Sequence, residues 1–107
     1  MVHDIYIIDD KNELKDKLIE NFRRETDEYK FKTVKTSELE VALRNIPSLI
    51  IIDEDNTDIN IVEFCKSIRS NEDNSITPII VASSNREKEH AVDVLKTDVQ
   101  YYIKKPL

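Results

Sequence analysis

The run Leu49-Ile50-Ile51-Ile52 constrains the fold of this chain more than any other segment. β-Branched residues in succession favour a strand, and an apolar run without alternating polar residues is typical of a strand buried on both faces. Such strands form parallel sheets whose faces are covered by helices. We therefore expect the rest of the chain to alternate further buried strands with helices that cross over the sheet.

Further short apolar or alternating runs predict four more strands, at residues 5–8, 29–34, 79–82 and 101–103. Longer amphipathic segments separate these runs. The resulting order, βαβαβαβαβ, predicts right-handed crossovers and an α/β fold with a doubly wound, five-stranded parallel sheet. A single domain over residues 1–107 suits a chain of this length.

Four helices are expected where apolar residues recur at helical spacing. The first begins near Leu14 with Asn12 as its N-cap, and the others span 37–46, 60–69 and 86–96, with Ser37 capping the second. A further helix should cover the sheet after the fifth strand, so we expect the domain to be truncated before its last helix. The residues expected to face inward are Leu14, Leu18 and Phe22, then Leu39, Ala42, Leu43 and Ile46, then Ile61, Phe64, Cys65 and Ile68, and finally Ala91, Val92 and Leu95.

Composition excludes several classes of function. A net charge of −6 disfavours direct nucleic-acid binding, and the pairs Arg23-Arg24 and Lys104-Lys105 are too short to offset it. The single cysteine, Cys65, permits no internal disulfide, and no apolar run approaches the length of a membrane span. We therefore expect a cytoplasmic protein. His3 and His90 lack metal-ligand spacing and are expected on the surface.

Polar residues follow four of the expected strands. Asp9 and Asp10 follow the first, Asp53 the third, Ser83 the fourth and Lys105 the fifth. Ligands of doubly wound sheets bind outside the carboxyl ends of the strands, where these side chains would converge. Clustered carboxylates suit a hard cation such as Mg²⁺, and a carboxylate can act as a nucleophile toward phosphorus while an ammonium holds a phosphoryl oxygen.

Four segments in this order resemble the landmarks of the receiver family of bacterial-type response regulators. They are Ile7-Ile8-Asp9-Asp10, Leu49 to Asp53, Pro78 to Ser83, and Tyr102-Ile103-Lys104-Lys105-Pro106. The resemblance covers nearly the whole chain. It implies a flavodoxin-like (βα)5 fold and a regulatory domain of a two-component pathway that assists its own phosphorylation and dephosphorylation but is otherwise no enzyme.

The resemblance also implies a role for each residue. Asp53 would accept a phosphoryl group from a sensor histidine kinase or a phosphotransfer protein. Mg²⁺ would be held by Asp10 and Asp53, by Asp9 with water, and by the backbone carbonyl of Asp55. Lys105 would hold the phosphoryl group.

The same resemblance implies the switch and the partners. Ser83 and Tyr102 would act as switch residues, and Asp55 and Asn85 would tune the lifetime of the phosphoryl group. The Lys105-Pro106 bond is expected to be cis. An output domain beyond Leu107, or a homodimer through the face of the fourth helix and fifth strand, would receive the signal.

The chain departs from the family pattern in two places. The loop after Asp53, residues 54–61, lacks the usual Pro and Gly, and Asp98-Val99 replaces the usual Gly-Ala pair. Because the chain has no glycine, Asn60 and Asp98 are expected to supply the left-handed backbone positions.

Other interpretations stay open at this level. Asp9 and Asp10 alone fit a pair of acids at a helix start, which the helix dipole favours, and Tyr102 fits a simple core aromatic. The altered loop after Asp53 allows a degenerate receiver that acts only as a protein-interaction module. Asp53 and Asp55 also fit, superficially, the paired acids of a haloacid dehalogenase-type hydrolase, although 107 residues leave little room for its cap.

Overall fold

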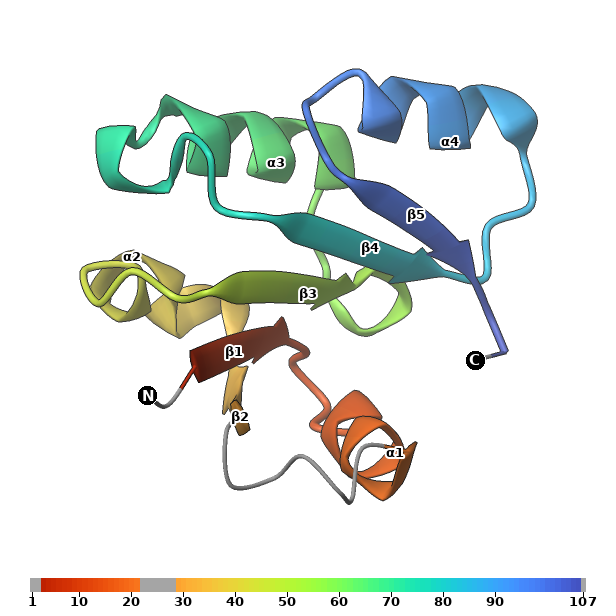
Figure 1. Ribbon diagram of the computed structural model, residues 1–107. Helices are drawn as coiled ribbons and strands as arrows, with labels where there is room; N and C mark the ends of the chain where they lie inside the picture. The colour runs from red at the N-terminus through yellow and green to blue at the C-terminus, as the bar shows by residue number, and fades with distance from the viewer. Residues whose placement is uncertain (1–2, 22–28, 107) are drawn as a thin grey trace.

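The structure, a computed structural model, describes residues 3–21 and 29–106. In this part of the chain all five expected strands form one parallel sheet, in the spatial order β2-β1-β3-β4-β5 (Figure 1). The expected α/β fold is confirmed. The strands are β1 (His3–Ile8), β2 (Tyr29–Val34), β3 (Leu49–Asp53), β4 (Ile79–Ser83) and β5 (Tyr101–Lys104).

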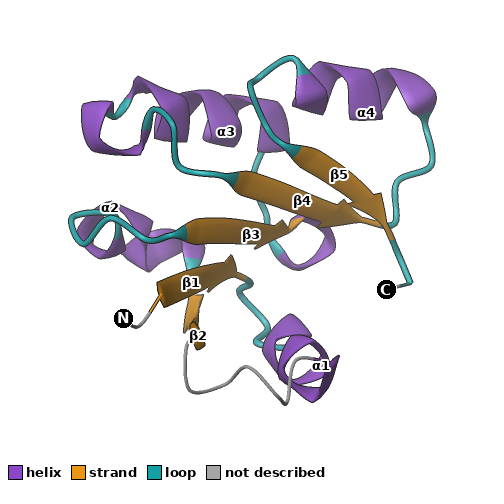
Figure 2. Cartoon of the chain, in the orientation of Figure 1, coloured by secondary structure: helices purple, strands orange, loops and turns teal. Residues whose placement is uncertain are grey.

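Helices cover the two faces of the sheet unequally. Helices α2, α3 and α4 lie on one side of the sheet and α1 lies on the opposite side (Figures 1 and 2). Strand β3 divides its side chains between these sides, since Ile50 and Ile52 pack into one apolar cluster and Ile51 into the other, with Leu14. This burial on both faces is what the apolar run predicts. The helices are α1 (Leu14–Asn21), α2 (Leu39–Ala42), α3 (Ile61–Ser70) and α4 (Lys88–Leu95), with short 3-10 turns η2 (Thr36–Glu38), η3 (Glu54–Asn56) and η4 (Glu72–Asn74).

Helix α2 is much shorter than the expected helix over 37–46. It begins only after the 3-10 turn η2, and neither turn nor helix uses Ser37 as its N-cap. After α2 the hydrogen bonds change from the α-helical to the 3-10 spacing, since the amides of Arg44 and Asn45 donate to carbonyls three residues earlier. Pro47 disfavours helical backbone at the residue before it, so Ile46 lies outside the helix and is 57% exposed rather than inward.

Helix α4 turns a different face to the core from the one expected. Val94 is fully buried and Ala91 partly so, whereas Val92 and Leu95 are 41% and 43% exposed. Residues 91 and 94, with the buried Thr97 beyond the helix, also follow helical spacing. The core-facing side of α4 is therefore formed by Ala91 and Val94, and Val92 and Leu95 do not belong to it.

Two asparagines exchange the roles expected of them. Asn12 is not the N-cap of α1 but adopts a left-handed backbone, with φ of 53°. Asn60 has φ of −76°, and its side chain caps α3 by accepting a hydrogen bond from the amide of Glu63. Asp98 supplies the second left-handed position, with φ of 64°, as expected. Asparagine suits both tasks because its short amide bonds locally to the backbone.

Several smaller predictions are confirmed. Cys65 is buried, Lys104 is exposed, and the Lys105-Pro106 bond is cis. Phe22 and the Arg23-Arg24 pair lie outside the described residues. Among the described helices, none combines the length and the apolar character needed to cross a membrane.

Candidate functional site

The candidate site lies at the carboxyl edge of the sheet, around Asp53. Ile8 of β1 pairs with Ile52 of β3, so the next residues, Asp9 and Asp53, follow adjacent strands. Asp53 is the last residue of the buried strand β3, and its side chain is only 1% exposed. A carboxylate in such a position is stable only with hydrogen-bonding or charged partners.

Lys105 and Asn56 hold the Asp53 carboxylate from two sides. The Lys105 ammonium lies 2.6 Å from Asp53 Oδ1, and the Asn56 amide donates to Oδ2 at 3.1 Å. Lys105 reaches this position because it follows β5, with its amide donating to the carbonyl of Ser83 at the end of β4. The structure therefore brings Asp53 and Lys105 together at the carboxyl edge of the sheet, where their strand ends were expected to converge.

Lys105 is shared with a second acid, Asp55. Its ammonium lies 3.1 Å from Asp55 Oδ2, and the same carboxylate accepts hydrogen bonds from the amide and the hydroxyl of Ser84. Burial raises the pKa of Asp55, but these bonds outweigh it and hold that pKa below its ordinary value. Burial lowers the pKa of Lys105, and the two acids more than reverse this, so it stands above its ordinary value.

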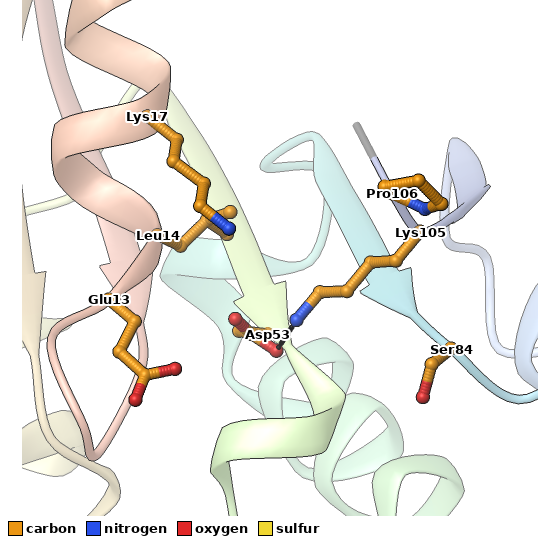
Figure 3. Close-up of a pocket in the computed structure, with 7 residues that line it drawn as sticks. All are labelled: Glu13, Leu14, Lys17, Asp53, Ser84, Lys105 and Pro106. Atoms are coloured by element: carbon orange, nitrogen blue, oxygen red, sulfur yellow. Dashed lines mark hydrogen bonds and ion pairs between the residues drawn. The ribbon is translucent and has the colours of Figure 1, made fainter.

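A pocket of about 420 Å³ opens above Asp53. Helix α1 forms one wall and the ends of β4 and β5 form the other, with the Asp53 carboxylate between them (Figure 3). The pocket leaves room for a small charged group attached to that carboxylate. Its lining residues are Glu13, Leu14, Lys17, Asp53, Ser84, Lys105 and Pro106.

Asp9 is fully buried and serves the start of α1. Its Oδ2 accepts hydrogen bonds from the amides of Glu13 and Leu14, both at 2.8 Å, and its Oδ1 accepts one from Lys11 at 2.9 Å. Burial raises the pKa of Asp9, but these amides and a bond from Asn56 together lower it below its ordinary value. In this structure the Asp9 carboxylate therefore acts as an acid at the start of a helix, which is the alternative that the sequence left open.

Asp10 turns its carboxylate toward the segment after β2. That carboxylate accepts hydrogen bonds from the amide of Thr36 at 2.8 Å and from its hydroxyl at 3.1 and 3.2 Å. The backbone of Asp10 stays beside the Asp53 loop, since its amide donates to the carbonyl of Asn56.

The oxygen ligands near Asp53 suit a hard divalent cation in their chemistry. Asp9, Asp10, Asp53 and Glu13 offer carboxylates, and Asn56 donates to both Asp53 and Glu13. Over residues 3–21 and 29–106, however, no three acidic, histidine or cysteine side chains are gathered as a ready metal cluster. Binding a cation through Asp10 requires its carboxylate to leave Thr36.

The two predicted switch residues lie together, on the α4 side of the sheet. Ser83 is fully buried, and its hydroxyl accepts a hydrogen bond from the amide of Asn85. The Tyr102 hydroxyl donates to the carbonyl of Asn85 at 3.2 Å. Burial raises the pKa of Tyr102 and the charges of Glu54 and Asp55 add to this, while a hydrogen bond with Ser83 opposes it. Ser83 thus contacts Tyr102 rather than Asp53.

His90 joins this group although it was expected on the surface. Its Nε2 lies 2.8 and 2.9 Å from the two carboxylate oxygens of Glu54, the residue after Asp53. Its ring also meets Tyr102 edge to face, with centroids 6.0 Å apart. Only 22% of the His90 side chain is exposed.

Sequence reasoning missed Glu13, Lys17, Asn56 and Ser84. Glu13 directly precedes α1 and Lys17 lies four residues later in its first turns, a spacing that favours one side of a helix starting at the carboxyl edge. That spacing was a usable signal. Ser84 could have been found by strand alternation, because it follows Ser83 and faces the opposite side. Asn56 carried no signal, since its position depends on the turn η3.

The sequence model of the response regulator receiver domain family matches residues 5–107. The chain belongs to this family. It is therefore a receiver domain of two-component signalling, which is a regulatory domain and not a hydrolase of the haloacid dehalogenase type. No curated protein sequence matches the chain.

Solved receiver structures share the fold at low sequence identity. The signal receiver domain of a DNA-binding response regulator from Colwellia psychrerythraea superposes with a TM-score of 0.85 at 18% identity, covering 98% of this chain and 87% of that one. The phosphorylated cyanobacterial phytochrome response regulator RcpA gives 0.80 at 22% identity, with 99% and 82% covered. The Mn²⁺-bound form of response regulator Rcp1 gives 0.80 at 17% identity, with 97% and 81% covered.

Proposed function

We propose that this receiver domain accepts a phosphoryl group on Asp53, with Mg²⁺, from a phosphohistidine of a sensor kinase or a phosphotransfer protein. One observation carries the proposal: the carboxylate of Asp53, 1% exposed, faces a pocket with the Lys105 ammonium 2.6 Å from its Oδ1. A buried acid with a fixed cation beside it is suited to form an acyl phosphate.

In the transfer, an Asp53 oxygen forms a bond to phosphorus while the bond from phosphorus to the imidazole nitrogen of the donor breaks. The electron pair of that bond stays with the imidazole. Lys105 neutralises charge on the phosphoryl oxygens, and Asn56 fixes the orientation of the Asp53 carboxylate.

Mg²⁺ would be held by Asp10 and Asp53, by Asp9 through water, and by the backbone carbonyl of Asp55. When bound, the ion offsets charge on the phosphoryl oxygens. The oxygen chemistry of these residues supports this assignment, as does the Mn²⁺-bound Rcp1 with the same fold. Asp10 would exchange its bonds to Thr36 for the cation.

Ser83 and Tyr102 would transmit the effect of phosphorylation at Asp53 to the surface of the domain. Both bond to Asn85, so a move of the Ser83 hydroxyl toward a phosphoryl group removes partners that now hold Tyr102. The changed surface would be the face of α4 and β5, read by an output domain or by a second copy of the chain in the cytoplasm. Asp55 and Asn85, beside the pocket, would tune the lifetime of the phosphoryl group.

The test is phosphorylation by a small phosphoramidate donor, followed by intact mass. We expect the wild-type protein to gain one phosphoryl group only when Mg²⁺ is present, and Asp53→Asn to gain none. Asp58→Asn is the matched control, because Asp58 is an exposed acid in the same loop. It should be labelled like the wild type.

Two results would contradict the proposal. Equal labelling of Asp53→Asn and wild type would move the acceptor to another residue. A wild-type protein that takes no label with Mg²⁺ would indicate a degenerate receiver that acts only as an interaction module.

A further inference from the structure

Three hydrogen-bond donors converge on the carboxylate of Asp55. The Ser84 amide lies 3.1 and 3.2 Å from its two oxygens, the Ser84 hydroxyl 2.9 Å from Oδ1, and the Lys105 ammonium 3.1 Å from Oδ2. A backbone amide, a hydroxyl and an ammonium are the groups with which proteins hold anionic oxygens. We call these three donors the anion-binding position.

The anion-binding position directly adjoins the proposed phosphoacceptor. Lys105 contacts Asp53 and Asp55 at once, and Asp53 pairs with Ala82, two residues before Ser84, on the neighbouring strand. Ser84, Lys105 and Asp53 line the same pocket, and the Lys105 side chain reaches across it to Asp53 (Figure 3). A group attached to the Asp53 carboxylate therefore comes within reach of donors that Asp55 now occupies.

The exposed fractions of Asp53 and Asp55 indicate that the Asp55 carboxylate is the one that can leave its hydrogen-bond donors. The Asp53 side chain is 1% exposed and lies between Lys105 and Asn56, whereas the Asp55 side chain is 31% exposed and can be hydrated once released. A phosphoryl group carries up to two negative charges and three acceptor oxygens, against one charge and two oxygens for a carboxylate. It therefore competes well for the same donors.

We propose that the Asp55 carboxylate fills the anion-binding position in the unphosphorylated protein and is displaced from it by the phosphoryl group on Asp53. This rests on the proposed function of Asp53. Asp55 is then a positioning residue that holds Ser84 and Lys105 in place and opposes phosphorylation. Its displacement releases Ser84, whose neighbours Ser83 and Asn85 bond to each other and to Tyr102.

The test is an equilibrium titration with beryllofluoride, a stand-in for the phosphoryl group, in the presence of Mg²⁺. Because Asp55→Asn removes the competing charge, we expect it to bind beryllofluoride about fivefold more tightly than the wild type. Asp58→Asn removes a charge from the same loop but makes no ion pair or hydrogen bond with Ser84 or Lys105 among the described residues. It should change the affinity less than about twofold.

The amide resonance of Ser84 gives a second readout that general charge effects do not imitate. In the free proteins it should differ between wild type and Asp55→Asn, since its acceptor differs. With saturating beryllofluoride the two resonances should converge, because the same fluorine atoms then face the amide.

The outcomes separate this inference from the proposed function. If the wild type binds beryllofluoride but Asp55→Asn binds no more tightly than Asp58→Asn, or the bound Ser84 resonances stay apart, Asp55 is not displaced and the inference fails alone. If the wild type binds no beryllofluoride with Mg²⁺, the proposed function fails and the inference fails with it.

Discussion

Asp9 shows how one side chain can fix the start of an element. It is fully buried, and three backbone amides at the start of α1 donate to its two oxygens. These amides lack carbonyl partners within a helix, so the carboxylate replaces the missing acceptors and also favours the positive end of the helix dipole. The position of α1, and thereby of Glu13 and Lys17 in the pocket, depends on this contact.

Replacing Asp9 by Asn should lower the free energy of unfolding by about 1 to 2 kcal/mol near pH 7, because one amide oxygen cannot accept all three bonds. The pKa of Asp9 is lower in the folded protein than its ordinary value of 3.8. Its ionised form therefore adds stability above the ordinary pKa, and this is lost as pH falls through the lower folded pKa. Urea unfolding should show the gap between wild type and Asp9→Asn narrowing below about pH 4.

Asp16→Asn is the matched control, since Asp16 lies in the first turn of the same helix but is exposed. It should cost less than about 0.5 kcal/mol. Equal losses for Asp9→Asn and Asp16→Asn would mean that the helix dipole, rather than the three hydrogen bonds, accounts for the effect. A constant gap at all pH values would contradict the lowered pKa.

At this scale the sequence predicts which residues reach the site better than it predicts how they bond there. Asp53 and Lys105 come together independently of the loop conformations, because parallel strands have their carboxyl ends at the same edge of the sheet. The orientation of Asp10 and Ser84 depends instead on turns that contain Asn12 and Asn56. No periodicity reports on those turns, so neither the Thr36 contact of Asp10 nor the Asp55 contact of Ser84 was predicted.

Between elements, His90 joins α4 to the turn η3 that follows the candidate acceptor. The ring nitrogen lies 2.8 and 2.9 Å from the Glu54 oxygens, and the two side chains are 22% and 17% exposed. Limited exposure makes such a pair stronger than one at the surface. His90 thus connects η3, through Glu54, with α4 and with Tyr102, whose ring it also contacts.

A double-mutant cycle of Glu54→Gln and His90→Ala measures this link. We expect a coupling of about 1 kcal/mol in the free energy of urea unfolding, with the double variant less destabilised than the sum of the single variants. The solvent-exposed pair Glu63 and Lys66 in α3 gives a control cycle, with a coupling below about 0.5 kcal/mol. Strictly additive effects at positions 54 and 90 would show that the contact does not join the two elements.

The order and type of the elements were predictable, and so were the inward residues Leu39 and Leu43 of the second helical segment, but the inward face of α4 was not. The spacing of apolar residues along the sequence determines whether a segment forms a helix or a strand. Which side of a helix is buried depends instead on which of its apolar side chains pack well against the sheet. In α4 the sheet takes Val94 and leaves the larger Leu95 exposed. For α2 the length was wrong rather than the face, because the 3-10 turn at its start and Pro47 beyond its end shorten the helix and leave Ile46 outside it and exposed.

Over the whole molecule, exposed apolar side chains are found on α4 and on the edge strand β5. Val92 and Leu95 of α4 are about two-fifths exposed, and Tyr101 of β5 is 65% exposed. These elements also carry the contacts of His90 and Tyr102 with the candidate site. The exposed apolar side chains and the contacts with the candidate site therefore lie in the same region, which suits the partner surface proposed above.

If that region pairs two copies of the chain on activation, beryllofluoride with Mg²⁺ should raise the dimer fraction in sedimentation velocity, and Leu95→Glu should weaken the dimer about tenfold or more. A charge at this position would have to be desolvated in the contact. Beryllofluoride binding itself should stay within about twofold of wild type, since Leu95 lies outside the pocket.

Val41→Glu is the control that distinguishes a specific dimer contact through α4 and β5 from non-specific hydrophobic association. Val41 is an apolar side chain of α2, 63% exposed, on an element with no contact to the candidate switch residues among the described bonds. It should leave the dimer unchanged. Equal weakening by Val41→Glu and Leu95→Glu would indicate loss of non-specific association through any apolar surface. No rise of the dimer with beryllofluoride would leave α4 and β5 as a surface for a different partner, because their link to Asp53 does not depend on a second copy of this chain.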